Sequence, residues 1–233
     1  MHPKRHWKTA KKIVDDLMPV VWNTTSRRKL EALPYGESSD FFYKFPDDVS
    51  FIYYRFLRVE KWDDHTAALC SRSFNPFIDV FVSDYACEMG IYDFTGWVRT
   101  VLYHETIHAL QHRYDLFHRE TPEKRFEVPY RFWDTSKSSK ERHLFLQQTS
   151  LAEMDASLGE FWCENGYLPE SEEEVFNLIY GTYDYPTNIM RRVARYVWGY
   201  YFEGKSEKLS KKRTQMFYNA FEKQCLQDQE THT

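Results

Sequence analysis

Residues 101–112 read VLYHETIHALQH, and this stretch contains an HExxH pattern that decides how the chain is interpreted. Four residues rotate an α-helix by about 400°, so His104 and His108 lie on one face, one turn apart. From there both imidazoles can bind one Zn²⁺ ion at ~2.0–2.1 Å. Glu105 is placed to take a proton from a water molecule that the metal activates, without being a ligand itself. The stretch therefore predicts a zinc centre with Glu105 as the general base.

The residues around the motif favour a metal site over a chance match. A short pattern of this kind also occurs in helices that bind nothing. Here Leu102, Ile107 and Leu110 flank the motif, so its polar side chains would be buried without a partner unless they had a function.

A catalytic zinc ion needs a third protein ligand and one open position. Glu153, 45 residues after His108, is the preferred candidate because small residues on its helical face would let that helix approach the HExxH helix. The alternative is that Glu153 belongs to a solvated face. His112 lies about 12 Å along the helix from His104, so we expect it at the surface or beside a ligand.

Asp155 is the rival of Glu153 for the third position. It falls on a different, apolar stripe of the segment LAEMDAS (151–157) and would be a buried carboxylate there. In that place it could instead accept a hydrogen bond from a ligand histidine and select the tautomer of the imidazole. The preferred assignment is one Zn²⁺ ion held by His104, His108 and Glu153.

The composition is that of one globular domain, or of one domain with a helical appendage. Of the 233 residues, 42% are hydrophobic, 18% aromatic and 28% charged. Only 8 glycines are present, which excludes collagen-like and broadly disordered classes. A net charge of −4 argues against the overall electrostatic footprint of a nucleic-acid-binding protein.

The cysteines and the N-terminus predict a cytoplasmic protein. The 4 cysteines are scattered without a CxxC pair, which is typical of reduced thiols and not of a disulfide framework. The basic N-terminus is not followed by the apolar stretch of a signal peptide, and no apolar run approaches the ~18 residues of a membrane span. We therefore expect no membrane partner.

Hydrophobic periodicity predicts an α+β fold that begins with a helix over Lys8–Val21, with Pro19 near its end. Aromatic and β-branched segments between turn residues then indicate a small antiparallel sheet. Its expected strands are Phe41–Phe45, Val49–Val59, Thr66–Ser73 and Phe77–Ser83. The HExxH helix follows, and the expected remainder is a loop at about 115–142, a glutamate-bearing helix at 141–164 and helices at 171–181, 187–203 and 207–226.

HETIHALQH (104–112) followed by AEMDAS (152–157) resembles the zincin metallopeptidases, specifically small gluzincins such as the ImmA/IrrE-type minimal zincins. The resemblance covers roughly residues 41–164. The chain departs from the family pattern in its long interval of 45 residues and in Ser157, which replaces the usual ExxxD spacing. The resemblance implies a zincin-like catalytic domain over 1–165, with its core at about 41–164 and an inserted loop at 115–142. It leaves 166–233 as a helical extension packed on that domain.

The resemblance also implies how a peptide would be bound. An edge strand above the cleft would pair with an extended peptide, and the last strand before the motif is the natural choice, with an ordinary core strand as the alternative. The side chains concerned are Ile78, Val80 and Val82. A proton-donating residue should help to stabilise the tetrahedral oxyanion. The candidates for this role are His143, Tyr183 and Tyr185.

Three functions follow as hypotheses. The preferred one is a zinc-dependent peptidase that acts on a protein or peptide, with Glu105 as base. A binding or regulatory protein could keep the zincin scaffold without catalysis, although a purely structural site needs no base. Basic C-terminal helices, with Arg191, Arg192 and Arg195, could dock the chain on nucleic acid, but a solvated face explains them better.

Overall fold

The fold is described from a computed structural model, which places residues 4–21, 24–46, 50–60, 68–71, 73, 75–88, 91–114, 116, 151–182 and 187–203. The chain divides into two compact units. The sheet unit comprises His2–His118 and Asp155–Gly166, and the helical unit comprises Met1, Arg119–Met154 and Tyr167–Thr233. The fold is mixed α and β, as the sequence predicts.

Several predicted segments lie outside the described residues. They are the loop at 115–142 apart from Leu116, the first part of the glutamate helix at 141–150, and the helix at 207–226.

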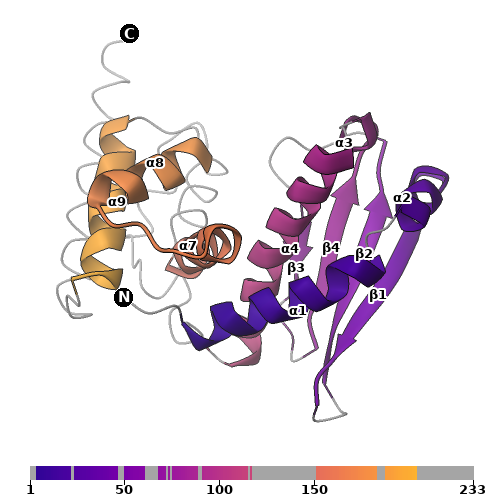
Figure 1. Ribbon diagram of the computed structural model, residues 1–233, viewed down its shortest axis with the longest axis horizontal. Helices are drawn as coiled ribbons and strands as arrows, with labels where there is room; N and C mark the ends of the chain where they lie inside the picture. The colour runs from indigo at the N-terminus through magenta and orange to yellow at the C-terminus, as the bar shows by residue number, and fades with distance from the viewer. Residues whose placement is uncertain are drawn as a thin grey trace, which may run out of the picture. The chain divides into compact units, whose positions relative to one another are not determined.

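The sheet unit contains a four-stranded sheet in the order β1 (Ser38–Lys44), β2 (Phe51–Arg58), β4 (Phe77–Val82) and β3 (Ala68–Cys70) (Figure 1). The β1/β2 and β3/β4 pairs are antiparallel, but β2 and β4 run parallel. The prediction of an antiparallel sheet is therefore wrong at its centre. The reason is that the chain reaches β3 at the edge before it returns to form β4 between β2 and β3.

One face of the sheet forms the core of this unit. Along β2 the side chains alternate between buried and half-exposed, as a strand covered on one face requires. The inward apolar side chains of β2 and β4 are at most 1% exposed. They are Ile52, Tyr54, Phe56, Ile78, Val80 and Val82.

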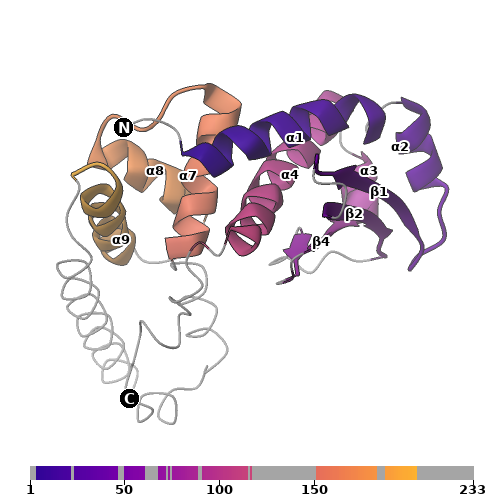
Figure 2. The ribbon, with the colours of Figure 1, turned by 90° about the horizontal axis from the view of Figure 1, so that it is seen from below.

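Two long helices pack in this unit, α1 (Arg5–Val21) and α4 (Ile91–Arg113) (Figures 1 and 2). α4 packs against β3 and β4, and α1 packs along α4. The apolar stripe of α1 is buried and consists of Trp7, Ala10, Ile13, Val14, Leu17 and Met18. Pro19 lies in the last turn, and the helix ends two residues later at Val21. The short helices α2 (Thr24–Glu31) and α3 (Asp84–Glu88) precede β1 and α4.

α7 (Leu151–Asn165) lies in close contact with α1 and α4 at Gly159. A Cβ atom at this position would come within 2.6 Å of Cδ1 of Ile107 and of Cδ1 of Trp7. Glycine therefore lets the three helices meet at a distance at which a methyl group would displace the side chains of Ile107 and Trp7. This approach brings one face of α7 to the face of α4 that carries the HExxH histidines.

In the helical unit, α8 (Glu172–Thr182) and α9 (Thr187–Tyr201) pack against each other. Arg191 of α9 binds Glu173 of α8 at 2.6 Å, and Arg195 binds Glu172 at 3.2 Å. Two arginines of the predicted basic face are thus paired with acidic side chains. None of the helices in the described part of the chain combines the length and apolarity needed to cross a membrane.

Candidate metal centre

The two histidines of the motif converge on one point beside α4. Their ring centroids are 4.8 Å apart, and their Nε2 atoms are 3.1 Å apart. Two nitrogen ligands at ~2.0–2.1 Å in a tetrahedral arrangement would be about 3.3 Å apart. The pair therefore already has the spacing that a single zinc ion requires.

Glu153 joins the histidines in a group that could hold a metal ion. Donor atoms of His104, His108 and Glu153 all lie within 4.8 Å of one another. The boundary between the compact units falls between Met154 and Asp155, but α7 is continuous there, so Glu153 is carried by the same helix that meets α4 at Gly159. Two imidazoles and one carboxylate are a donor set found in catalytic zinc sites. The residues present thus fit a zinc ion.

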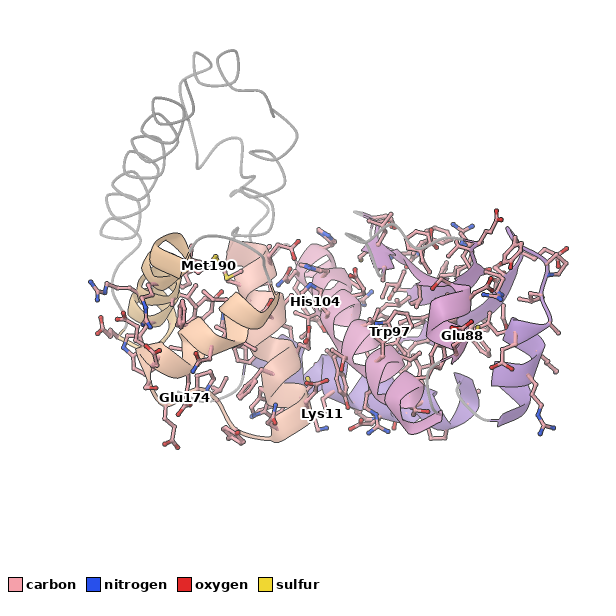
Figure 3. The ribbon with its side chains drawn as sticks, turned by 90° about the horizontal axis from the view of Figure 1, so that it is seen from above. Lys11, Glu88, Trp97, His104, Glu174 and Met190 are labelled. Carbon is pink, nitrogen blue, oxygen red and sulfur yellow. The ribbon has the colours of Figure 1, made fainter. Side chains whose placement is uncertain are left out.

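The Nδ1 atoms of both histidines face hydrogen-bond acceptors. Nδ1 of His104 lies 2.9 Å from Oε2 of Glu160 on α7, and Figure 3 shows His104 on the side of α4 that faces this helix. Nδ1 of His108 lies 2.9 Å from Oε1 of Gln111. An acceptor at Nδ1 keeps the proton of a neutral imidazole on that nitrogen, so the lone pair is on Nε2. The Nε2 atoms are the ones at which the two rings converge.

Sequence reasoning missed both of these acceptors. The site predicted from the sequence includes neither Glu160 nor Gln111. The signal for Glu160 is its position seven residues after Glu153, on the same face of α7. The signal for Gln111 is its position three residues after His108, where helical side chains are neighbours.

Asp155 does not belong to the metal group. Residues two apart on a helix point about 200° away from each other, so Asp155 does not share the face of Glu153 that meets the two histidines. It is fully buried and accepts hydrogen bonds from Lys4 Nζ at 2.5 Å and His6 Nε2 at 2.6 Å. Burial alone would raise the pKa of this carboxyl, but the hydrogen bond from His6 and the charge of Lys4 outweigh it and lower the pKa to about 2.

The expected contact between Asp155 and a ligand histidine is indirect in the structure. Nε2 of Gln111 donates to Oδ2 of Asp155 at 2.9 Å, and Oε1 of the same amide faces His108. His112 lies outside the metal group, half-buried near the end of α4. The candidates His143, Tyr183 and Tyr185 lie outside the described residues.

The prediction that Ile78, Val80 and Val82 belong to an edge strand is wrong. β4 pairs with β2 on one side and with β3 on the other. The apolar character that made this segment a strand candidate reflects its central place, because a strand with neighbours on both sides and a covered face is buried. The edge of the described sheet on this side is β3, where Leu69 is 54% exposed.

α4 is bonded to the sheet at the residue next to Glu105. A buried hydrogen bond of 3.0 Å between Thr106 of α4 and Tyr54 of β2 joins the helix to the sheet. Desolvation raises the pKa of Tyr54, so its hydroxyl stays protonated in this contact. Glu105 and His104 are half-exposed on another side of the helix, where their side chains are accessible to solvent.

Comparisons of the chain with protein-family models, with curated proteins and with solved structures found no match.

Proposed function

We propose that this protein is a zinc-dependent metallopeptidase, with His104, His108 and Glu153 as the metal ligands. The observation that carries the proposal is the convergence of these donor atoms within 4.8 Å, with the two Nε2 atoms 3.1 Å apart. Zinc bound by two histidines and a carboxylate supplies Lewis acidity that polarises a carbonyl group and makes water more acidic. The remaining chemistry is assigned to side chains of the chain.

Glu105 is proposed as the general base. Glu105 lies three residues before His108 and is half-exposed, so water can reach its carboxylate. In the proposed reaction it takes a proton from the attacking water and delivers that proton to the leaving amine of the peptide. The strand β3, which is the edge of the sheet in the described part of the chain, is a candidate for pairing with an extended substrate.

A test of this function compares the wild-type chain with Glu105→Gln and His108→Ala. Purified wild type should contain close to one equivalent of zinc by elemental analysis, and His108→Ala should lose most of it. Glu105→Gln should keep the zinc and the fold but lose ~10²–10⁴-fold in peptide hydrolysis, because the amide cannot act as a base.

Hydrolysis is assayed by mass spectrometry on a whole-proteome peptide mixture, with a chelator-treated sample as control. Zinc retained at full occupancy in His108→Ala would contradict the ligand assignment. Identical peptide patterns for wild type, Glu105→Gln and chelated protein would contradict catalysis and favour a binding protein with a zincin-like site. The nucleic-acid alternative receives no support from Arg191 and Arg195, because both are paired with glutamates of α8.

A further inference from the structure

Gln111 connects the candidate ligand His108 to the buried carboxylate of Asp155. Its Oε1 atom lies 2.9 Å from Nδ1 of His108, and its Nε2 atom lies 2.9 Å from Oδ2 of Asp155. Gln111 is 1% exposed and Asp155 is 0% exposed, so water does not compete for either contact. The three side chains form a continuous hydrogen-bonded path that ends at the ring of His108.

The contact with Asp155 decides which end of the amide faces His108. A side-chain amide has a donor end and an acceptor end of nearly the same shape, and its partners determine the orientation. An ionised carboxylate can only accept hydrogen bonds, so the NH₂ group must face Asp155 and the oxygen must face His108. That oxygen in turn requires the proton of the imidazole on Nδ1.

Donors from the N-terminal segment keep Asp155 in its carboxylate form. Lys4 and His6 contact its two oxygens at 2.5 and 2.6 Å, and the indole N–H of Trp7 lies 3.3 Å from Oδ2. An ionised carboxylate in the protein interior needs partners of this kind. The start of the chain therefore contributes to the orientation of a side chain on α4.

We propose that Gln111 is a positioning residue which, held by Asp155, presents an acceptor to Nδ1 of His108 and directs the Nε2 lone pair of that ring at the metal position. This inference rests on the proposed zinc site and adds the residues that prepare one of its ligands. The HExxH pattern itself does not include such a residue. Gln111 lies three residues beyond it, on the face of α4 that carries His108.

Two substitutions at Gln111 separate positioning from general support of the fold. Gln111→Met keeps the length of the side chain but removes the acceptor, and should weaken Zn²⁺ binding ~10–100-fold, as is found for residues that orient metal ligands. Gln111→Glu keeps an acceptor for His108 but places a second carboxylate beside Asp155. It should bind Zn²⁺ close to the wild-type affinity while losing more stability than Gln111→Met.

The matched control is Tyr54→Phe. It removes a buried hydrogen bond to Thr106, on the same helix as His108, without touching the path through Gln111. It should lower stability and leave the Zn²⁺ affinity unchanged. Affinity is measured by competition with a chromogenic chelator, and stability by urea unfolding of the metal-free proteins.

The results distinguish this inference from the proposed function. Weak binding by Gln111→Met together with retained binding by Gln111→Glu supports the inference. Wild-type Zn²⁺ affinity in Gln111→Met overturns the inference. It is also overturned if both variants bind Zn²⁺ more weakly in proportion to the stability that each has lost. If the wild-type chain binds no Zn²⁺, the proposed function fails and the inference fails with it.

A double-mutant cycle tests the part played by Asp155. If Asp155 acts on His108 through Gln111, Asp155→Asn should weaken Zn²⁺ binding in the wild-type background and have little further effect in the Gln111→Met background. Equal effects in the two backgrounds would show that Asp155 does not act through Gln111. The Gln111 variants alone still decide the main proposal where Asp155→Asn does not fold.

Discussion

Oε2 of Glu160 lies 2.9 Å from Nδ1 of His104, so α7 contacts the ring of a candidate ligand on the side opposite to the metal position. The same face of α7 carries Glu153 two turns earlier. One helix thus provides both the third candidate ligand and the residue that orients the first. The close packing of α7 on α4 is therefore part of the proposed site.

Removing this contact should weaken metal binding. Glu160→Ala should lower the Zn²⁺ affinity ~10–100-fold, because the ring of His104 loses the acceptor that holds its tautomer and orientation. Glu164→Ala is the matched control, since that carboxylate lies one turn further along and binds Thr100 of α4. Chelator competition measures both. Equal affinities in the two variants would show that Glu160 does not orient the ligand.

Gly159 and Gly96 should respond to alanine in opposite directions. At Gly159 the new methyl group would meet the fully buried ring of Trp7 and the end of Ile107 at 2.6 Å, so we expect a loss of ~1–3 kcal/mol in the free energy of unfolding. Gly96 in α4 has nothing within 4 Å of such a methyl group, so alanine should stabilise by ~0.5–1 kcal/mol through helix propensity. Urea unfolding measures both changes. An unfolding free energy of Gly159→Ala equal to that of wild type would contradict the packing of α7 described above.

Asp155 should make the protein sensitive to acid. The pKa of this carboxyl is lowered from 3.8 to about 2 in the folded state, so its contribution to stability is complete above pH ~4 and is lost as the pH falls through 2. The contribution is on the order of 2 kcal/mol. Unfolding free energies measured from pH 5 to pH 2 should fall more steeply for wild type than for Asp155→Asn. Parallel curves would show that Asp155 is not preferentially ionised in the fold.

Cys163 should be inert in the folded protein. Burial raises the pKa of this thiol to about 12, which reduces its thiolate fraction at pH 8 by a factor on the order of 10³ relative to an ordinary cysteine. Cys87 is half-exposed and serves as the internal comparison. Alkylation with iodoacetamide, followed by peptide mass spectrometry, should modify Cys87 first and Cys163 only in urea. Equally fast modification of both would mean that α7 opens readily.

Local sequence patterns predicted the elements that depend only on near neighbours. The helix predicted over Lys8–Val21 and the strand predicted over Val49–Val59 appear as α1 and β2, within a few residues of those bounds. The facing pair of His104 and His108 is equally local, because one helical turn separates them wherever the helix packs. These features did not require knowledge of the rest of the chain.

The order of the strands could not be predicted in this way. The pattern of β4 marks it as apolar but does not say whether one or two strands flank it, so the sequence left both an edge strand and a core strand open. The strand lies between β2 and β3. The choice depends on which distant segments pair, and pairing energies are set by packing between elements and not by the strand itself.

The sequence by itself determined the helix of the HExxH motif, the pairing of its two imidazoles and the presence of a small sheet beside it. Only the tertiary structure decided that Glu153 and not Asp155 faces the histidines, and that Glu160 and Gln111 are the acceptors behind them. The physical reason is that helical periodicity defines the faces of a helix but not what covers each face. That is settled by long-range packing, here by the approach of α7 to α1 and α4 at Gly159.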